Sequence, residues 1–248
     1  MSFLSDLDHT SATAAFPPVT QALPEPDGLL AVGGCLSVPR LINAYQSGIF
    51  PWFSSNDPIL WWSPSERAVI FPNQLHISKS LAKFIRKKPY RITLNMVFSS
   101  VIKQCATIPR GDPSNGVWIT ADMIRAYEQL HRAGHAHSIE IWHDDQLVGG
   151  LYGVLVGTVF CGESMFSKAD NASKIALVAI RDYLVPYGLT LIDCQIPNPH
   201  LASLGAVTLP RKKFIGLLKS GLNGLEGMSV KGSTTLIGAQ YMLARELN

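Results

Sequence analysis

A glycine-rich apolar run at residues 146–166 (QLVGGLYGVLVGTVFCGESMF) constrains the fold of this chain more than any other stretch. Its glycines stand among Leu, Val, Tyr and Phe, at Gly149, Gly150, Gly153, Gly157 and Gly162. Such a composition is typical of core strands whose backbone is approached closely by another group. The run ends in Cys161, Glu163 and Ser164, polar residues that an apolar strand carries only where they have partners or a function. The stretch therefore predicts buried strands that end near a functional site.

The composition indicates a globular protein with two unequal domains. Of 248 residues, 47% are apolar and 16% are charged, which provides a hydrophobic core and is unlike a disordered chain. We expect a small, aromatic-rich N-terminal domain at residues 1–70, with a loose leader at 1–15. A larger domain is expected at 71–248, with a C-terminal tail from about residue 232.

Charge and hydropathy limit the environment of the protein. The net charge of +3 is too small to indicate nucleic-acid binding by bulk electrostatics, so a local cluster of cations would have to provide it. No apolar run approaches the roughly 20 residues of a membrane span, and the first residues lack the pattern of a signal peptide. We expect a cytoplasmic protein without membrane association.

The cysteines and histidines do not indicate a metal or a thiol nucleophile. Cys35, Cys105, Cys161 and Cys194 form no CxxC pair, and we interpret them as reduced, mostly buried thiols. Neither Cys161 nor Cys194 is expected to be a nucleophile, because each lies in an apolar strand without a nearby cation. The histidines show no ligand spacing, so no metal site is predicted.

Periodicity predicts an α+β fold. From residue 136 the apolar period changes to two, which predicts antiparallel strands at 136–142, 146–154 and 158–166. A capped helix at 171–184 and a strand at 189–196 follow. We expect a small N-terminal α/β domain followed by a domain with a mixed β-sheet, similar in topology to the acetyltransferase-type (GNAT) arrangement.

Aromatic residues are concentrated early in the chain. Three of the five tryptophans, Trp52, Trp61 and Trp62, lie close together. We expect Trp61 and Trp62 to fill the limited core of a small domain. Trp52 lies between Pro51 and a polar turn, which makes it a candidate for an exposed platform that stacks a base.

A helix expected after its cap, Ser78, carries a basic outer side. Its cations are Lys79, Lys83, Arg86, Lys87 and Lys88. Two interpretations stay open for this face, a solvated surface and a strip that contacts nucleic-acid phosphates.

The strand at 189–196 (LTLIDCQI) carries an acid and an amide in an apolar setting. Two-residue alternation directs Asp193 and Gln195 to one face and makes them neighbours. Asp193 could merely buttress a backbone turn. Together with Glu163, however, these groups would converge on one cleft, which favours a functional interpretation.

Two functions are compatible with the residues alone. The sequence QLVGGLYG is similar to the glycine loop that holds the pyrophosphate of acetyl-CoA, which favours a coenzyme A dependent N-acyltransferase. Clustered Trp, Lys and Arg also fit a non-catalytic RNA-binding protein.

A resemblance to a known family covers residues from about 16 to 218. It rests on EPDGLLAVGG (25–34), AYQSGIFPWFS (44–54), DPILWWSP (57–64), LHIS (75–78), WIT (118–120), AHSIEIW (136–142), LVGGLYG (147–153), FCGESMFS (160–167), NASKIAL (171–177), LIDCQ (191–195) and HLASLGA (200–206). With these pieces the chain resembles the leucyl/phenylalanyl-tRNA–protein transferase family. Cys35 departs from the pattern, which usually has an acid after the paired glycines.

The resemblance implies transfer of Leu or Phe, with Met as a further donor residue, from aminoacyl-tRNA to the N-terminal Arg or Lys of acceptor proteins. The product would carry an N-degron of the N-end rule. No cofactor and no metal are implied, and a monomer is expected. The acyltransferase becomes the alternative function.

The resemblance also implies roles for individual residues. Gln195 would hydrogen-bond the incoming ammonium and help remove its proton, Asp193 would hold and polarise Gln195, and Glu163 would supply a further polar contact. Trp52 and Trp118 would contact the terminal adenosine of the tRNA. The acceptor-stem phosphates would meet Lys83, Arg86 and Lys87. An apolar pocket for the transferred amino acid would be lined by Leu151, Phe160, Leu177, Ile180 and Ile192.

Overall fold

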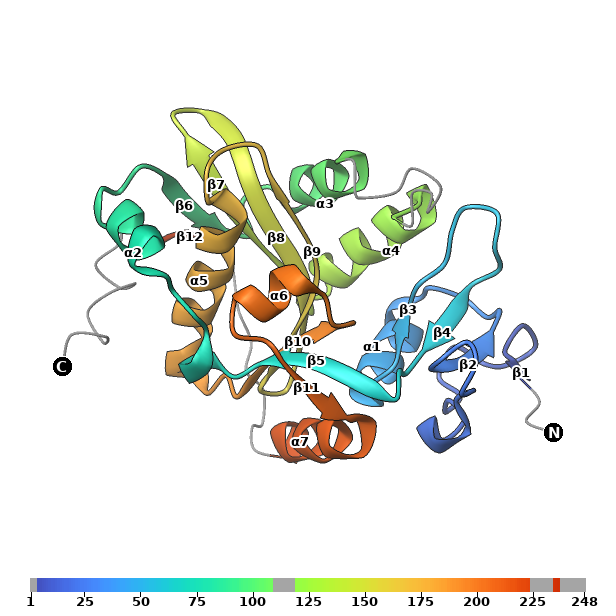
Figure 1. Ribbon diagram of the computed structural model, residues 1–248. Coiled ribbons are helices and arrows are strands. Elements are labelled where there is room, and N and C mark those ends of the chain that lie inside the picture. Colours follow the sequence, from blue (N-terminus) through green and yellow to red (C-terminus); the bar gives the residue numbers. More distant parts are fainter. Residues whose placement is uncertain (1–3, 109–118, 224–233, 237–248) are drawn as a thin grey trace.

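The computed structural model describes residues 4–108, 119–223 and 234–236 and has a mixed α+β architecture (Figure 1). A small sheet lies at the N-terminal end of the chain. Its strands, in spatial order, are β1 (Ser5–Asp6), β2 (Leu29–Val32), β4 (Leu60–Trp62) and β3 (Phe50–Pro51). The pair β1–β2 is parallel and the other pairs are antiparallel.

A larger sheet forms the centre of the molecule. Its order is β11 (Val207–Pro210), β5 (Glu66–Ile70), β10 (Leu191–Gln195), β9 (Val159–Ser167), β8 (Gln146–Val156), β7 (Ala136–His143), β6 (Arg91–Leu94) and β12 (Thr234–Leu236). Within this larger sheet, β9 and β10 are the only described strands that pair in parallel. The predicted antiparallel run of three strands is confirmed as β7, β8 and β9.

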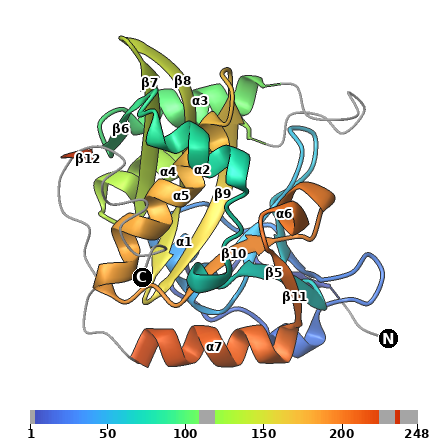
Figure 2. The ribbon, with the colours of Figure 1, turned by 60° about the vertical axis from the view of Figure 1, so that its left-hand side comes forward.

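Helices cover both faces of the large sheet (Figure 1). The α-helices are α1 (Val38–Gln46), α2 (Lys79–Arg86), α3 (Phe98–Thr107), α4 (Ala121–Arg132), α5 (Ala172–Leu184), α6 (Pro199–Ser203) and α7 (Arg211–Asn223). Short 3₁₀ turns occur at Val19–Gln21, Pro72–Gln74 and Val185–Tyr187. Helix α5 packs on β7, β8 and β9 from one side, while α3 packs on the same strands from the other. Helix α7 lies against β11 and β5 at the edge of the sheet (Figure 2).

Alternation along β8 divides the interior into two cores. Tyr152 and Val154 belong to the core under α3 and α4, which continues into the small sheet and includes the fully buried Trp61. Leu151 and Leu155 belong to the core under α5. Because side chains of a strand point alternately to opposite faces, one apolar strand supplies both cores. The predicted burial of Trp61 is confirmed.

Two glycines of β8 are explained by close packing of the protein itself. A Cβ at Gly149 would lie 2.5 Å from the Cβ of Ala172, so the first residue of α5 lies directly on the strand. A Cβ at Gly153 would lie 2.3 Å from the carbonyl oxygen of Cys161. Carbon cannot approach so closely, and glycine is therefore needed at both positions. Other parts of the protein therefore occupy the space beside Gly149 and Gly153, and these two glycines do not form a phosphate cradle.

Side-chain caps begin two of the helices, and a third helix begins without the expected cap. The Ser78 hydroxyl accepts a hydrogen bond from the Leu81 amide at 3.2 Å, as predicted. Thr120 caps α4 in the same way, at 3.3 Å from the Met123 amide. Asn171, expected to cap α5, makes no such bond, and its backbone is left-handed (φ 60°), whereas a capping residue is ordinarily extended. The Ser167 hydroxyl accepts from the Ser173 amide instead, at 3.2 Å.

The strands change sheets between residues 62 and 66. Strand β4 ends the small sheet at Trp62, and β5 begins at Glu66 and pairs with β10 and β11 in the large one. β5 thus lies on the N-terminal side of the domain boundary expected at residue 70, and that boundary stays a prediction. Of the helices that the structure describes, none is long and apolar enough to cross a membrane.

Candidate active site

A cavity of about 290 Å³ opens where β3 faces the end of β10, and we call it the β3–β10 pocket. Its lining residues are Phe50, Pro51, Trp52, Glu163, Cys194, Gln195, Ile196 and Asn198. The predicted polar residues Glu163 and Gln195 are thus brought together with Trp52. A larger cavity of about 680 Å³ shares no lining residue with it. The smaller cavity is the candidate active site, because it contains an ionisable group with a strongly shifted pKa.

The pocket exists because two parallel strands stop pairing. β9 and β10 pair from Val159 and Leu191 to Cys161 and Asp193. After Asp193 a bulge interrupts the pairing of β10 with β5, and Gln195 has a left-handed backbone with φ 57°. Glu163 and Gln195 therefore follow the last paired residues and approach each other, with the Gln195 Nε2 donating to Oε1 of Glu163 at 3.0 Å.

Asp193 has a partner that the sequence analysis did not identify, Arg67 of β5. The Arg67 Nε donates to Oδ1 of Asp193 at 2.8 Å, and Nη2 donates to Oδ2 at 2.7 Å. The side chains are 2% and 0% exposed. This fork-to-fork geometry is the strongest arrangement of an ion pair. A charged residue inside the apolar strand ERAVI was the available signal.

The surroundings of Arg67 immobilise its guanidinium. The Phe50 and Phe214 rings each have their centroid 4.6 Å from its central carbon. The Gly48 carbonyl accepts a further hydrogen bond from Nη1 at 3.3 Å. Burial alone lowers the pKa of Arg67, but the carboxylate of Asp193 raises it above the ordinary value. The Asp193 carboxylate thus favours the charged guanidinium.

Asp193 contacts the backbone of Gln195 and not its side chain. Oδ1 of Asp193 accepts a hydrogen bond from the Gln195 amide at 3.0 Å. The side-chain amide of Gln195 is held by Glu163. Asp193 therefore fixes the conformation of Gln195 through the left-handed turn, a conformation that is unusual for a residue other than glycine.

Glu163 ends a chain of hydrogen bonds that comes from two helices. The Tyr127 hydroxyl of α4 donates to Oε2 of Glu163 at 3.0 Å, and it also shares a short hydrogen bond with Tyr45 of α1. Burial raises the pKa of Glu163 to about 7, against the lowering effect of the hydrogen bonds from Tyr45 and Tyr127. Glu163 can therefore exchange a proton near neutral pH. Neither tyrosine was singled out from the sequence, where both have the spacing of ordinary core residues.

The thiols beside the pocket are protonated. Burial and the Asp193 carboxylate raise the pKa of Cys161 and of Cys194 above the ordinary value, while Arg67 lowers both. The expectation that these cysteines lie far from any cation is thus wrong. Burial has the larger effect on each thiol, so neither is an activated nucleophile.

The remaining predicted site residues lie in different places. Trp52 is 41% exposed, packs edge-on against Trp62, and accepts a hydrogen bond from the Trp62 indole at its carbonyl oxygen, 2.6 Å away. Trp118 lies outside the described residues. The residues predicted for the amino-acid pocket are all at most 2% exposed within the core under α5 and line neither cavity: Leu151, Phe160, Leu177, Ile180 and Ile192.

The basic residues of α2 lie far from the pocket. Lys83, Arg86 and Lys87 are exposed, and within the described part of the chain no ion pair involves them. Figure 1 shows α2 and the loop between β3 and β4 at opposite ends of the molecule, with α5, β8 and β9 between them.

Comparison with known proteins gives matches over most of the chain. The family model of the leucyl/phenylalanyl-tRNA protein transferase matches residues 69–219, and that of the N-terminal domain of the same transferase matches residues 34–65. A leucyl/phenylalanyl-tRNA–protein transferase of Escherichia coli O81 (strain ED1a) is 55% identical over 204 residues, or 82% of this chain and 86% of that protein.

Further matches are similar in kind or more remote. A transferase with the same description from Erwinia tasmaniensis is 52% identical over 217 residues, or 88% of this chain and 92% of that protein. Among solved structures, L-PGS from Bacillus licheniformis covers 61% of this chain and 48% of its own at 10% identity. Its TM-score of 0.37 is too low to establish a shared fold.

Proposed function

Since this chain belongs to the leucyl/phenylalanyl-tRNA–protein transferase family, we propose that the β3–β10 pocket is where it transfers the amino acid. The enzyme is an aminoacyltransferase that moves Leu or Phe from aminoacyl-tRNA to the N-terminus of a protein. The observation that carries the location is that Glu163, Gln195 and Trp52 line one cavity.

The reaction needs little more than a free amine in the right position. The α-amine of the acceptor attacks the carbonyl carbon of the aminoacyl ester. A C–N bond forms, the C–O bond to the ribose breaks, and the ribose oxygen leaves with a proton. The ester is already activated, and an α-amine has a pKa of about 8, so it loses its proton readily near neutral pH. No covalent enzyme intermediate is required.

Glu163 accepts the proton of the amine in this proposal, and Gln195 holds the amine. An amide is too weak a base to take a proton itself, whereas the carboxylate of Glu163 has a pKa of about 7, close to that of the amine. The Gln195 Nε2 is bonded to Glu163, so its Oε1 is the atom that accepts a hydrogen bond from the incoming ammonium. The two side chains therefore bind the same amine.

Arg67 and Asp193 are positioning residues for this pair. Their buried salt bridge holds the Asp193 side chain in place, and its Oδ1 accepts a hydrogen bond from the backbone amide of Gln195. Without this acceptor the left-handed turn at Gln195 would have no compensation for its strain. The Gln195 side chain would then lose its direction toward Glu163.

The donor is proposed to enter beside Trp52 and Gly162. A half-exposed Trp52 presents a flat surface on which the terminal adenosine can stack, and we assign the same contact to Trp118, which lies outside the described residues. A Cβ at Gly162 would meet Asp193 O at 3.7 Å, an ordinary contact, so the backbone beside Glu163 is not closely packed. The amino-acid side chain would pass Gly162 towards Phe160 and Ile192 of the core under α5, with Leu151, Leu177 and Ile180 behind them.

Other features of the activity belong to the same proposal. The acceptor residues are N-terminal Arg and Lys, and the added Leu or Phe marks the protein for degradation in the cytoplasm. The exposed cations Lys83, Arg86 and Lys87 contact the acceptor-stem phosphates, and the enzyme acts as a monomer. The run from β7 to β9, helix α5 and the parallel strand β10 support an acetyltransferase-type arrangement of the large sheet.

A transfer assay tests the proposal directly. Leu-tRNA, Phe-tRNA and Val-tRNA are offered with a peptide that begins with Arg, and mass spectrometry detects a product longer by one residue. We expect extension with Leu and Phe, little with Val, and none when the peptide N-terminus is acetylated. Incubation with acetyl-CoA and the same peptide separates this activity from that of an N-acetyltransferase. Acetylation without aminoacyl transfer would contradict the proposal.

A further inference from the structure

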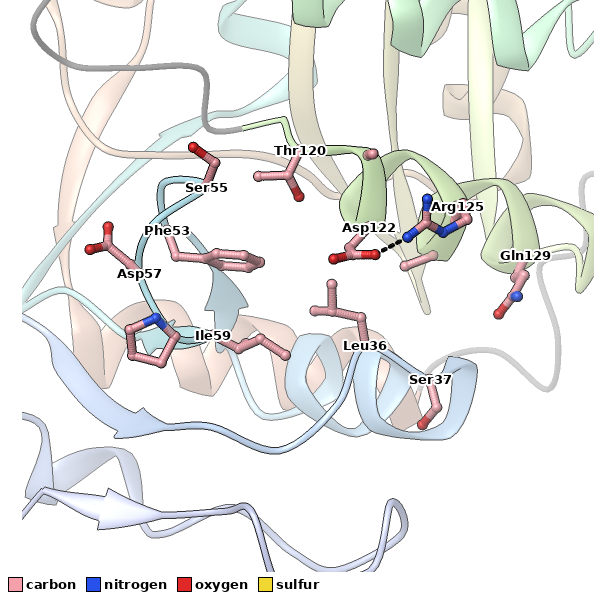
Figure 3. A pocket seen from close by; sticks show the side chains of 13 residues that line it. Leu36, Ser37, Phe53, Ser55, Asp57, Ile59, Thr120, Asp122, Arg125 and Gln129 are labelled. Atoms are coloured by element: carbon pink, nitrogen blue, oxygen red, sulfur yellow. Dashed lines mark hydrogen bonds and ion pairs between the residues drawn. The ribbon is translucent and has the colours of Figure 1, made fainter.

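The larger cavity, which we call the α4 pocket, is formed by three separate segments (Figure 3). The residues just before α1, the loop between β3 and β4, and residues 120–129 of α4 with its cap surround about 680 Å³. The loop has a defined shape, because Asp57 accepts from the Ser54 amide at 3.1 Å while the Asp57 amide donates to the Ser54 carbonyl at 3.0 Å. The volume lies within the range of sites that bind ligands.

The α4 pocket has an apolar floor and a polar rim. Leu36, Phe53 and Ile59 extend toward the middle of the cavity in Figure 3, and all three are only partly buried. Hydroxyl and amide groups of Ser55, Thr120 and Gln129 stand around them. Partly buried apolar side chains that surround a cavity are suited to receive another apolar side chain, and the polar rim can hydrogen-bond a peptide backbone.

The charges of the α4 pocket do not suit nucleic acid. Its ionisable residues are Asp57, Asp122 and Arg125, and Arg125 is already paired with Asp122. The net charge of the lining is therefore negative, which repels phosphates and attracts a basic polypeptide. The proposed phosphate-contacting cations of α2 also lie at the other end of the molecule (Figure 1).

Consecutive residues of one segment line the α4 pocket and the β3–β10 pocket. Trp52 lines one cavity and the next residue, Phe53, lines the other. Helix α4 also serves both: Tyr127 donates to Glu163, while Asp122 and Gln129 face the α4 pocket. An extended polypeptide advances roughly 3.4 Å per residue. If Glu163 and Gln195 hold the acceptor amine, the residues that follow the first would therefore reach the α4 pocket within a short peptide.

We propose that the α4 pocket binds the acceptor polypeptide beyond its first residue, with an apolar side chain of the acceptor packed against Leu36, Phe53 and Ile59. This inference rests on the proposed function, because it assumes that the acceptor amine lies in the β3–β10 pocket. The enzyme would then recognise several residues of the acceptor, while the tRNA approaches from the side of α2.

Steady-state kinetics with acceptors of two lengths test the inference. One acceptor is a dipeptide that begins with Arg, and the other is an Arg-initiated peptide of about eight residues with apolar residues after the first. The variant Ala121→Trp fills the cavity from an exposed position in the first turn of α4. We expect it to raise KM for the long peptide about tenfold and to leave kcat/KM for the dipeptide unchanged.

Matched controls separate binding from stability. Ala133→Trp adds the same side chain at an exposed position at the other end of α4, outside the cavity, and should change neither acceptor. Phe53→Ala removes part of the apolar floor and should raise KM for the long peptide alone, whatever its effect on the melting temperature.

Two results would overturn the inference while the proposed function stands. The first is an equal effect of Ala121→Trp on both acceptors. The second is a raised KM for aminoacyl-tRNA with the dipeptide as acceptor, which would assign the cavity to the donor. By contrast, no transfer to either acceptor by the wild-type enzyme would refute the proposed function itself.

Discussion

Arg67 and Asp193 lie 126 residues apart in the sequence and form a two-point salt bridge in the interior. The pair joins β5 to β10 at the point where β10 turns toward the β3–β10 pocket. Two aromatic rings and the Gly48 carbonyl surround the guanidinium, so neither charge can be relieved by solvent. The conformation of Gln195 therefore depends on a salt bridge that lies behind the pocket.

A double-mutant cycle on Arg67 and Asp193 measures this dependence. Arg67→Met or Asp193→Leu alone leaves an uncompensated buried charge and should lower the free energy of unfolding by about 3 to 5 kcal/mol. The double variant should lose less than the sum of the two, because no charge is left unpaired. Urea denaturation gives these energies. Additive losses would show that the two side chains are not coupled.

Activity in the same cycle separates positioning from stability. The double variant should recover stability but not transfer, because the Gln195 amide still lacks its acceptor. We expect kcat to fall at least tenfold while the affinity for aminoacyl-tRNA is kept. A stable double variant with wild-type kcat would remove Asp193 and Arg67 from the mechanism.

The pH dependence of transfer should reveal Glu163. Its pKa is about 7, and the proton acceptor is the carboxylate form, so kcat/KM should rise as the pH increases through 7. The acceptor amine titrates as well, near pH 8, in every variant. Glu163→Gln should therefore lose the limb near 7 and keep the limb of the amine. An unchanged profile in Glu163→Gln would assign proton removal to another group.

Tyr127→Phe tests the cause of the Glu163 pKa. The Tyr127 hydroxyl favours the carboxylate form, so its removal should move the limb of Glu163 in the pH profile of kcat/KM to higher pH.

The contribution of Glu163 to the free energy of unfolding changes with pH in the opposite direction to that of an ordinary salt-bridged acid. Because the folded pKa is raised, the contribution of Glu163 is full below about pH 4.5 and is lost as the pH rises through 7.

The sequence predicted what depends on short-range patterns. Alternation placed the strands β7 to β9 correctly, and a single hydroxyl indicated the cap at Ser78. These features depend on neighbours within a few residues. For the same reason Glu163 and Gln195 could be selected as polar residues at the ends of apolar strands.

The sequence did not predict pairings between distant elements. The partner of Asp193 is decided by the register of β5 against β10, and the partner of Glu163 by the packing of α4 on α1. No local pattern encodes either contact. The bulge after Asp193 was not predicted either, because regular alternation would direct Asp193 and Gln195 to one face with their side chains adjacent.

Gly162→Ala should separate folding from catalysis. A Cβ there would have no neighbour closer than 3.7 Å, in contrast to 2.5 Å at Gly149 and 2.3 Å at Gly153, so the protein should fold with a nearly unchanged melting temperature. If the donor side chain passes Gly162, the added methyl group should lower kcat/KM, and more for Phe-tRNA than for Leu-tRNA. Gly149→Ala is the control that should instead lose stability. Full activity of Gly162→Ala with both donors would place the donor side chain elsewhere.

Trp52→Ala tests the stacking platform. The hydrogen bond from the Trp62 indole goes to the Trp52 backbone and survives the substitution, so the loss of stability should be small. Stacking of one base on an aromatic ring contributes about 1 to 3 kcal/mol, which corresponds to a rise of at least fivefold in KM for aminoacyl-tRNA. Tyr187→Ala removes another exposed aromatic ring, outside the pocket lining, and should leave KM unchanged. A fall in stability without a change in KM would make Trp52 a core residue.

The cations of α2 can be distinguished from a solvated face by their salt dependence. Replacing Lys83, Arg86 and Lys87 with Ala should weaken aminoacyl-tRNA binding most at low salt, because each lost phosphate contact reduces the release of counterions. The slope of the logarithm of the binding constant against the logarithm of salt concentration should become shallower by about two. The matched control removes the same number of charges from exposed positions on α7, at Lys212, Lys213 and Lys219. If both triple variants change the slope equally, the enzyme attracts tRNA only by its net charge, and α2 is a solvated face.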